Sequence, residues 1–313
     1  FKTKSIFNIH FSLLPAYKGM FTSALPILHN KFKTGVTLHE IDAGIDTGNI
    51  IDQKEITIDI SDTARDLYTK YVKMGTELVI KNITNLVENN YSSYKQSYKK
   101  STYYGKKSID YSILKINYRQ TAEQVLRELR AFSFREYQLP KFQNNQIEKG
   151  QITRINSTLK PGAIVYENDR KIQVATIDYD IVLFKDLYEV LWKYCEVNDY
   201  SNLKNLLSIQ KFDLETKTKE GWTALIISAY NGAFECLELL INHGANINAA
   251  NYNHTTALMY AKTNYLNTDN KKCLNKLIDS GADLDSKDVF GKTLLDWVKE
   301  ENTVLYNYLR EII

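Results

Sequence analysis

Two stretches near the start of the chain decide its fold: residues 8–19, NIHFSLLPAYKG, and residues 34–51, TGVTLHEIDAGIDTGNII. Both open with apolar residues typical of a strand and then break at Gly, Pro or Asp into a loop or turn. Asn8 and His10 are two residues apart on the first predicted strand, so their side chains point to the same face. Asp46 follows the second strand in a turn bounded by glycines. The pattern predicts polar groups gathered where strands end.

An amide, an imidazole and a carboxylate in these positions are suited to acyl transfer. In an open parallel sheet, catalytic groups gather at the carboxyl ends of the strands, and we expect that arrangement here. The imidazole and the amide would hold a developing oxyanion, while the carboxylate would orient the imidazole or take the proton of an amine. A histidine at a strand end and an aspartate in a turn are also common structural features, so the residues alone leave both interpretations open.

The first 94 residues alternate between predicted strands and helices, which indicates an α/β layer structure. Strands are expected over residues 5–11, 34–42 and 49–58. A long amphipathic helix is expected over residues 62–89, with Ser61 as its N-cap. A doubly wound sheet needs more strands than these, and we therefore expect this region to be only part of such a domain.

The middle of the chain, residues 95–185, consists of short apolar runs separated by Gly, Pro and Asn. This pattern predicts a small β-rich domain of hairpins, preceded by one helix at residues 121–131. The segment carries 17 Lys and Arg against 9 Asp and Glu, a balance of +8 within a chain whose net charge is +3. Such a basic segment is expected to face an anion such as a diphosphate, with a merely solvated basic face as an equal alternative.

A repeat occupies the last third of the chain, residues 186–313. Thr223 recurs as Thr256 after 33 residues, and Gly244 recurs as Gly281 after 37 residues. A Thr that opens one helix and a Leu-Leu pair followed by Gly-Ala that closes the next resemble the ankyrin repeat. In that repeat the Thr caps the first helix and the Gly supplies a left-handed turn after the second. The resemblance implies an all-α module of three to four repeats.

The two stretches quoted first resemble the formyltransferase family that uses N10-formyltetrahydrofolate, whose motif is N-x-H-x-SLLP-x-x-x-G followed by GVT and D-x-G-x-DTG. The resemblance implies that Asn8, His10 and Asp46 are the catalytic residues. It also implies a Rossmann-like domain of which residues 1–94 are the C-terminal half, the first half being missing ahead of Phe1. The residues expected beside the folate belong to the SLLP loop and the DTG turn: Ser12, Leu13, Leu14, Pro15, Asp42, Gly44 and Thr47. Ordinary core packing is the alternative for the two leucines.

Residues 101–116 and 130–140 look like the corresponding parts of sugar N-formyltransferases. These enzymes formylate the amine of a dTDP-linked amino-dideoxy sugar for O-antigen synthesis. With an ankyrin tail behind it, the resemblance points to dTDP-3-amino-3,6-dideoxyglucose, with the 4-amino isomer as an alternative. Tyr stacks and donates, while Lys and Arg meet phosphate oxygens. The candidate substrate contacts are Tyr103, Tyr104, Lys106 and Arg135. Packing within the β-rich domain is the alternative for both tyrosines.

Two other functions fit the same features. A methionyl-tRNA formyltransferase would use the basic middle segment to bind RNA, but that task needs no ankyrin module, and we expect no nucleic acid partner. The second alternative is a non-catalytic ankyrin binding module attached to a remnant enzyme domain. The ankyrin module is expected to bind a protein, to mediate a homodimer, or to hold a nucleotide sugar through Trp222 and Tyr230, aromatic side chains that can stack on a base. Trp at this position is also common in ordinary repeats.

Composition argues against several classes of protein. The chain is 43% hydrophobic and 25% charged, which is ordinary for a globular protein, and it has no apolar run long enough to span a bilayer. The opening residues lack the features of a signal peptide. Three cysteines without metal-ligand spacing indicate buried, reduced thiols in a cytoplasmic protein, and we expect no metal site. His29, His39 and His254 are assigned no partner.

Overall fold

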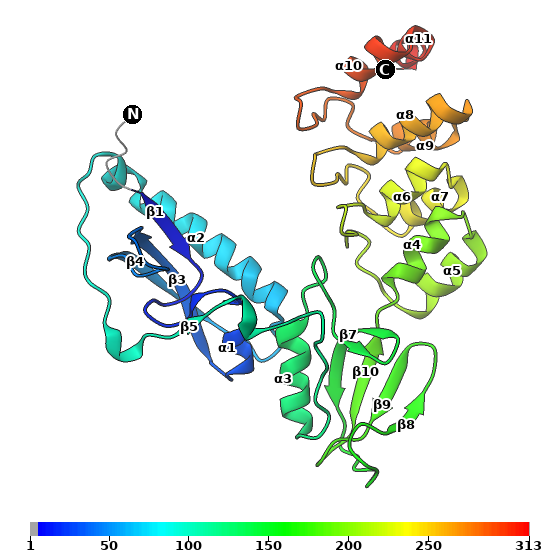
Figure 1. The fold of residues 1–313 in the computed structure, drawn as a ribbon. Helices are drawn as coiled ribbons and strands as arrows, with labels where there is room; N and C mark the ends of the chain where they lie inside the picture. Colours follow the sequence, from blue (N-terminus) through cyan, green and yellow to red (C-terminus); the bar gives the residue numbers. More distant parts are fainter. Residues whose placement is uncertain (1–5, 313) are drawn as a thin grey trace. The chain divides into compact units, whose positions relative to one another are not determined.

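The structure is a computed structural model that describes residues 6–312, apart from the side chain of residue 312. It contains two compact units, Phe1–Asp186 and Leu187–Ile313 (Figure 1). The first unit combines strands with helices, and the second is helical. The predicted fold class, an α/β region with a β sheet and an all-α repeat module, is confirmed.

The N-terminal sheet consists of β1 (Phe7–His10), β3 (Lys33–Glu40) and β4 (Ile50–Thr57), in the order β1-β3-β4. All three predicted strands form, although Ser5, where the first was expected to begin, lies outside the described residues. The expected parallel pairing is wrong, because β3 runs antiparallel to both neighbours. The turn of residues 41–49 joins β3 to β4, and a parallel crossover needs about a dozen residues or more.

One face of this sheet packs on α2 (Ala64–Val87). Gly75 permits a close approach, because a Cβ at this position would come within 3.0 Å of the Ile9 side chain. On the same face, Lys54 of β4 forms an ion pair of 2.7 Å with Glu77 of the helix. The other face of the sheet is therefore left for the loops that follow β1 and β3.

The N-cap of α2 differs from the prediction. Ser61 is not the cap; Thr63 is, and its side chain accepts a hydrogen bond from the backbone N–H of Asp66. The Asp66 carboxylate accepts in return from the Thr63 backbone N–H at 2.9 Å, which completes a capping box. Three residues after Ser61 the chain has Ala64, which cannot complete such a box.

Short elements connect this sheet to the rest of the unit. β2 (Lys18–Gly19) pairs in parallel with β5 (Tyr103–Tyr104), so two segments far apart in sequence lie side by side. The remaining connecting elements are α1 (Leu25–Leu28), η1 (Tyr98–Lys100) and η2 (Lys106–Ser108).

A second sheet follows α3 (Ala122–Phe132), whose N-cap is Thr121. Its strands are β6 (Lys141–Phe142), β7 (Asn145–Ile152), β8 (Ile164–Glu167), β9 (Lys171–Val174) and β10 (Ile181–Lys185). They pair antiparallel in the order β6-β7-β10-β9-β8, which confirms the predicted hairpins and the helix before them.

A single hydrophobic cluster runs from Ala24 of the first sheet region to Leu183 of β10. It contains the apolar faces of α2 and α3 together, including Leu67 and Leu129. Residues on both sides of residue 94 thus share one core. The domain boundary proposed at that residue stays a prediction.

The second unit is a stack of helix pairs. The helices are α4 (Tyr188–Glu196), α5 (Tyr200–Ile209), α6 (Ala224–Asn231), α7 (Phe234–Asn242), α8 (Ala257–Thr268), α9 (Lys272–Asp279), α10 (Leu294–Glu301) and α11 (Thr303–Ile312). Thr223, Thr256 and Thr293 cap α6, α8 and α10, each accepting from a backbone N–H three residues on. Gly244 and Gly281 both have φ of +86°, the left-handed turn expected after the second helix. The predicted roles of these threonines as helix caps and of these glycines as left-handed turns are confirmed.

The three cysteines of the chain all lie in helices of the second unit. Cys195, Cys236 and Cys273 are all buried and free. Burial raises the pKa of the Cys195 thiol to about 12, so this thiol stays protonated and unreactive near neutral pH. Within residues 6–312, no helix is both long and apolar enough to cross a membrane.

The capping box predicts how α2 responds to mutation. Thr63→Ala should destabilise the start of α2 by about 1 kcal/mol, because it leaves a first-turn N–H without its acceptor. Hydrogen exchange measured by mass spectrometry on peptides covering residues 61–72 should therefore be faster in this variant. Ser61→Ala is the matched control and should exchange like the parent; the reverse result would restore Ser61 as the cap.

Candidate active site

The register of β1 on β3 sets the first layer of the site. Asn8 lies directly opposite His39, and His10 lies opposite Thr37. Because strand side chains alternate, Asn8 and His10 share the face that points away from α2. Gln53 of β4 pairs with Thr37 and adds a third strand to this face. One side of the sheet is therefore polar.

Thr37 anchors the loop that follows β1 onto this polar face. Its side chain is fully buried. The Thr37 hydroxyl donates to the Ser12 carbonyl at 2.6 Å and accepts from the Leu14 N–H at 3.1 Å. The Gln53 amide donates both to this hydroxyl at 2.8 Å and to the Leu14 carbonyl at 3.0 Å. Buried hydrogen bonds of this kind hold the loop backbone in one position.

The SLLP loop packs largely against its own protein. Ser12 and Leu14 are buried, and Leu13 lies over Gly35, where a Cβ would come within 2.5 Å of the Leu13 side chain. Pro15 is partly exposed, and its carbonyl accepts from the Thr102 N–H at 3.2 Å. The four residues of this loop that were predicted to lie beside the folate thus help to shape the loop. Their contact with a folate stays a prediction.

Asp46 reaches the two histidines from the turn after β3. Its carboxylate lies 3.4 Å from His10 Nδ1 and 3.8 Å from His39 Nε2, and its side chain is 12% exposed. The Gly19 N–H donates to Asp46 Oδ2 at 2.8 Å. Asp46 has a φ of +54°, in the left-handed region that few residues other than glycine occupy. The predicted trio of Asn8, His10 and Asp46 is thus brought together, with His39 among them.

Asp42, Gly44 and Thr47 shape the turn that carries Asp46. The Asp42 carboxylate accepts from the Gly44 N–H at 3.0 Å and from the Thr47 hydroxyl at 2.5 Å. The hydrogen bond from Thr47 lowers the pKa of Asp42. A Cβ on Gly44 would come within 2.0 Å of the Thr47 hydroxyl, so this position needs glycine. These three predicted folate contacts are exposed and bond to one another, and a folate contact stays a prediction for them too.

The hydrogen bonds fix the tautomer of His39 and the orientation of Asn8. His39 Nδ1 lies 2.7 Å from the Glu40 carbonyl, which can only accept, so Nδ1 carries a proton. In the neutral ring, Nε2 is then an acceptor, and the Asn8 amide nitrogen faces it at 3.3 Å. One N–H of the Asn8 amide is used in this way. For the second N–H, no partner is described within residues 6–312.

His10 is arranged to accept a proton. Its Nε2 donates to the Tyr17 carbonyl at 2.8 Å, which leaves Nδ1 with a lone pair toward Asp46. Burial lowers the pKa of His10, while the Tyr17 carbonyl and Asp46 oppose that shift. The ring is therefore neutral near pH 7, and the carboxylate beside Nδ1 would stabilise the imidazolium formed by one added proton. The arrangement can serve as a general base.

Two of the predicted substrate residues lie beside this site on β5. Tyr104 stacks on Tyr17, with ring centroids 5.6 Å apart, and its ring lies 5.7 Å from that of His29. The Tyr17 hydroxyl and His29 Nδ1 are 3.1 Å apart. Tyr103 is the more exposed of the pair, at 57%. The structure thus gives His29, which had no assigned partner, a place in an aromatic group next to the loop of His10.

The two predicted cationic contacts differ from each other. Lys106 is exposed in η2, two residues after β5. Arg135 forms an ion pair of 2.8 Å with Asp186, whose side chain is 1% exposed. Removing one partner of a buried pair is costly, so Arg135 has a structural role whatever ligand it meets. Its assignment to a diphosphate stays a prediction.

In the ankyrin unit, Trp222 and Tyr230 belong to one aromatic cluster. Their ring centroids are 5.1 Å apart, and Tyr260 of α8 lies 4.7 Å from Trp222 and 5.8 Å from Tyr230. Trp222 is partly buried and Tyr230 is 41% exposed. The cluster packs α6 against α8 and still leaves aromatic surface accessible.

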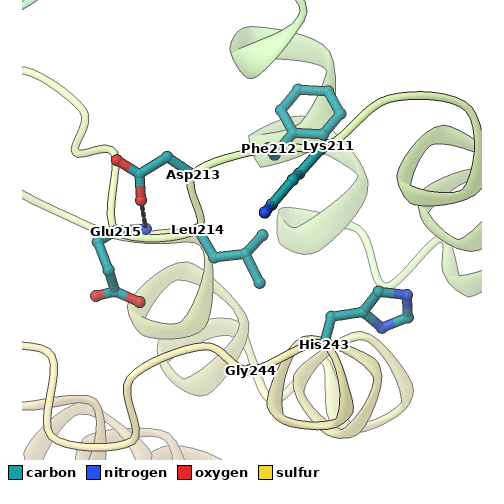
Figure 2. A pocket seen from close by; sticks show the side chains of 7 residues that line it. All are labelled: Lys211, Phe212, Asp213, Leu214, Glu215, His243 and Gly244. Carbon is teal, nitrogen blue, oxygen red and sulfur yellow. Dashed lines mark hydrogen bonds between the residues drawn. The ribbon is translucent and has the colours of Figure 1, made fainter.

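The same unit contains an open pocket near the C-terminal end of α7, with a volume of about 530 Å³. Figure 2 shows Asp213 and Glu215 on one side of Leu214, with Lys211 and His243 on the other. The two carboxylates accept from backbone N–H groups, Asp213 from Glu215 and Glu215 from Asn246. These bonds shape the loop after α5, and nothing else in the pocket points to a ligand.

Comparison with known proteins connects the polar cluster to a family. Residues 2–83, which include Asn8, His10, His39 and Asp46, match the family model described as formyl transferase. This part of the chain is therefore similar to the formyl transferase family. Residues 191–288 match the model for three copies of the ankyrin repeat and lie within the helix pairs of the second unit.

Two solved structures are each similar to more than half of this chain. An N-formyltransferase from Helicobacter canadensis, in complex with folinic acid and dTDP-3-aminofucose, is 42% identical with a TM-score of 0.52 over 58% of this chain and 66% of its own. WlaRD, a sugar 3N-formyl transferase solved with dTDP and 5-N-formyl-THF, is 44% identical with a TM-score of 0.51 over 57% of this chain and 65% of its own.

The curated relatives include methionyl-tRNA formyltransferases. The protein of this name from Legionella pneumophila strain Corby is 31% identical over 180 residues. That alignment covers 57% of this chain and 57% of the relative. The chain therefore spans little more than half the length of the curated relatives it matches.

Three residues of the polar site were not predicted from the sequence: His39, Thr37 and Gln53. Thr37 and His39 alternate on one strand of the GVTLHE run, and this period of two was a usable signal for a shared face. It could not identify which face meets Asn8, because that depends on the register with β1. Gln53 lies 16 residues beyond Thr37 in sequence and carried no signal of its own.

The surroundings of His10 predict its titration. In two-dimensional NMR of the ring resonances, we expect the pKa of His10 to lie below the ordinary value of 6.5, because burial disfavours the charged ring. Asp46→Asn should lower this pKa further, since it removes a charge that favours the imidazolium. Glu55→Gln, which removes an exposed carboxylate of β4 paired with Lys33, is the control and should leave this pKa unchanged. A rise in Asp46→Asn would contradict the pairing.

Proposed function

We propose that this chain carries the catalytic residues of a nucleotide-sugar N-formyltransferase. The reaction would transfer a formyl group from N10-formyltetrahydrofolate to the amine of dTDP-3-amino-3,6-dideoxyglucose. The observation that carries the proposal is the cluster of Asn8, His10 and Asp46 within a formyltransferase region. A role in O-antigen synthesis follows from the substrate and belongs to the same proposal.

The choice of a 3-amino sugar is supported by the two solved relatives. One is described as bound to dTDP-3-aminofucose and the other as a sugar 3N-formyl transferase. Both are more than 40% identical to this chain, and both contain a folate derivative. A folate cosubstrate and a thymidine diphosphate sugar are therefore the partners proposed for this chain. The 4-amino isomer remains the alternative acceptor.

The proposed chemistry uses the proton-accepting arrangement of His10. The neutral sugar amine attacks the formyl carbon, a new C–N bond forms, and the ammonium proton passes to His10 Nδ1, where Asp46 stabilises the imidazolium. Collapse of the tetrahedral intermediate breaks the bond to N10 of the folate, and the same proton returns to that nitrogen. Atoms and charge balance without another reactant.

Asn8 is the oxyanion donor that this geometry favours. His10 Nε2 is committed to the Tyr17 carbonyl, so the ring offers no free N–H to an oxyanion in this arrangement. The Asn8 amide bonds to His39 with one N–H and has a second in the same plane. A positioned donor of this kind typically contributes about a hundredfold to turnover. The oxyanion role expected of His10 and Asn8 together is thereby proposed for Asn8 alone, and His10 takes the proton-accepting role expected of Asp46.

Two surfaces suggest that a complete enzyme needs more protein beside this unit. Among the described residues, β1 pairs only with β3, so its other edge offers unpaired backbone groups. The helix α2 also carries a stripe of exposed apolar side chains, which a larger domain would cover. The residues of the stripe are Tyr68, Val72, Ile80, Ile83 and Val87.

The acceptor assay separates this proposal from its alternatives. It uses the chain itself and a chimera that adds the part of the Helicobacter canadensis enzyme that the chain does not cover. We expect the chimera to formylate dTDP-3-amino-3,6-dideoxyglucose. Formylation of methionyl-tRNA alone would overturn the proposal in favour of the tRNA enzyme, which the 31% identical relative supports. No transfer by either protein would favour a non-catalytic ankyrin binding module.

In the active protein, His10→Asn and Asp46→Asn should each lower kcat by about a hundredfold or more, the usual scale for acid–base and oxyanion groups. Single-turnover formylation followed by liquid chromatography measures the effect. Glu55→Gln serves as the matched control, because this exposed carboxylate of β4 pairs with Lys33 and belongs neither to the turn nor to the proposed folate contacts. Near-parent turnover in either active-site variant would refute the assignment.

The ankyrin unit is proposed to hold a partner at its aromatic cluster. A nucleotide sugar would stack its base on Trp222 or Tyr230, and a protein would use the same accessible aromatic surface. We expect Trp222→Ala to weaken dTDP binding to this unit by about tenfold in isothermal titration, in line with a stacking contribution of about 1–3 kcal/mol per base. Unchanged dTDP binding would favour a protein as the partner of the ankyrin unit. A homodimer and a cytoplasmic location stay predictions.

A further inference from the structure

Residues 93–104, which we name the strap, run between the two loops that carry the active-site groups. Their first half binds the turn of Asp46. Tyr94 exchanges two backbone hydrogen bonds of 2.9 Å with Ile50, at the start of β4. The Ser93 hydroxyl donates to the Glu40 carboxylate at 2.9 Å, at the end of β3. The strap therefore bridges both strands that flank the turn.

Gln96 then makes direct contact with the turn itself. Its side-chain nitrogen donates to the Asp46 carbonyl at 2.8 Å and to the Gly48 carbonyl at 2.7 Å. Two carbonyl acceptors fix the orientation of this amide, because only its nitrogen can donate. Gln96 Oε1 is buried and has no partner within the described residues. An amide held at that cost indicates that the two bonds to the turn matter.

The second half of the strap binds the loop of His10. The Thr102 hydroxyl accepts from the Tyr17 N–H at 2.8 Å, and the Thr102 carbonyl accepts from the Lys18 N–H at 2.9 Å. The Tyr17 carbonyl accepts the hydrogen bond that His10 Nε2 donates. One residue of the strap thus holds the peptide that orients the catalytic imidazole.

Gly19 contacts both the strap and the Asp46 carboxylate. It pairs with Tyr104 of the strap, and its N–H donates to the Asp46 carboxylate. A Cβ on Gly19 would come within 2.3 Å of the Tyr104 carbonyl, so only glycine allows this approach. The strap, the His10 loop and the Asp46 turn form one closed network of hydrogen bonds.

We propose that the strap sets the separation between His10 and Asp46, with Gln96 as the positioning residue for Asp46 and Thr102 as the positioning residue for His10. Asp46 needs this support because it has a left-handed backbone, which is unfavourable for most residues other than glycine. Misplacement of a catalytic group by about 1 Å can lower turnover by a hundredfold. The proposal rests on the proposed function only for its effect on kcat.

The strap also carries Tyr103 and Tyr104, both proposed to contact the substrate. A ligand that orders these side chains would act on the same segment that holds Asp46 and His10. Positioning by the strap thus places substrate binding and the catalytic geometry on one element.

The test substitutes single residues of the strap and measures the pKa of the His10 imidazole. In Gln96→Leu, the Asp46 turn loses two hydrogen bonds and its carboxylate moves away from His10. We expect the pKa of His10, measured by NMR titration, to fall toward its value in Asp46→Asn. In the formyl-transfer assay, we expect kcat to fall by about tenfold or more with KM nearly unchanged. Gln96→Met, which keeps the length of the side chain and removes the donor without adding a charge, provides a second variant if Gln96→Leu does not fold.

Matched variants separate positioning from general damage. Tyr98→Ala alters the most exposed tyrosine of the strap, at 92% exposure, and should leave both the His10 titration and kcat unchanged. Thr102→Val should lower kcat, whereas Thr102→Ser, which keeps the hydroxyl, should restore it. An unchanged His10 pKa in folded Gln96→Leu or, where that variant does not fold, in Gln96→Met overturns the proposal, whatever happens to kcat. The titration needs no formyl transfer, so it still decides the proposal if the protein proves inactive.

Discussion

Antiparallel pairing of β1 with β3 is the constraint on which the polar site depends. Strand side chains alternate, so a slip of one residue would turn Asn8 and His10 toward α2 and bring Ile9 to the polar face. The observed register is favoured from both sides of the sheet. On one side Ile9 meets Gly75 of α2, and on the other the hydroxyl of Thr37 meets the loop backbone. The packing that buries the apolar face of the sheet therefore also determines which residues lie on its polar face.

Buried polar groups then fix what the sheet alone leaves free. The loop after β1 has no regular backbone pairing along residues 11–17, yet Thr37 and Gln53 hold its carbonyl and N–H groups. Each such bond adds about 1 kcal/mol to stability, and leaving a buried group unpaired costs more than that. Irregular backbone over a polar sheet face thus becomes as well defined as a strand.

The sequence was informative where spacing alone settles geometry. Asn8 and His10 share a face because they are two residues apart, and the threonines that open the ankyrin helices are recognisable from their period. The sequence could not show which residues meet across paired strands. His39 reaches Asn8 only through the register of two strands, and Gln96 reaches Asp46 from 50 residues away. The parallel sheet was wrongly expected because strand direction depends on connections, and the short turn of residues 41–49 allows only a reversal.

The balance of charge at His10 shows why several weak contacts are needed together. Burial alone would make the ring a poor base, and an unshielded carboxylate alone would hold it permanently protonated. Asp46 accepts from the Gly19 N–H, which draws off part of its charge, and stands 3.4 Å from the imidazole, where a hydrogen bond is not yet formed. A ring that is neutral near pH 7 and faces a carboxylate suits the general base of the proposed formyl transfer. That state depends on the distance between two loops, and hence on the residues that hold those loops apart.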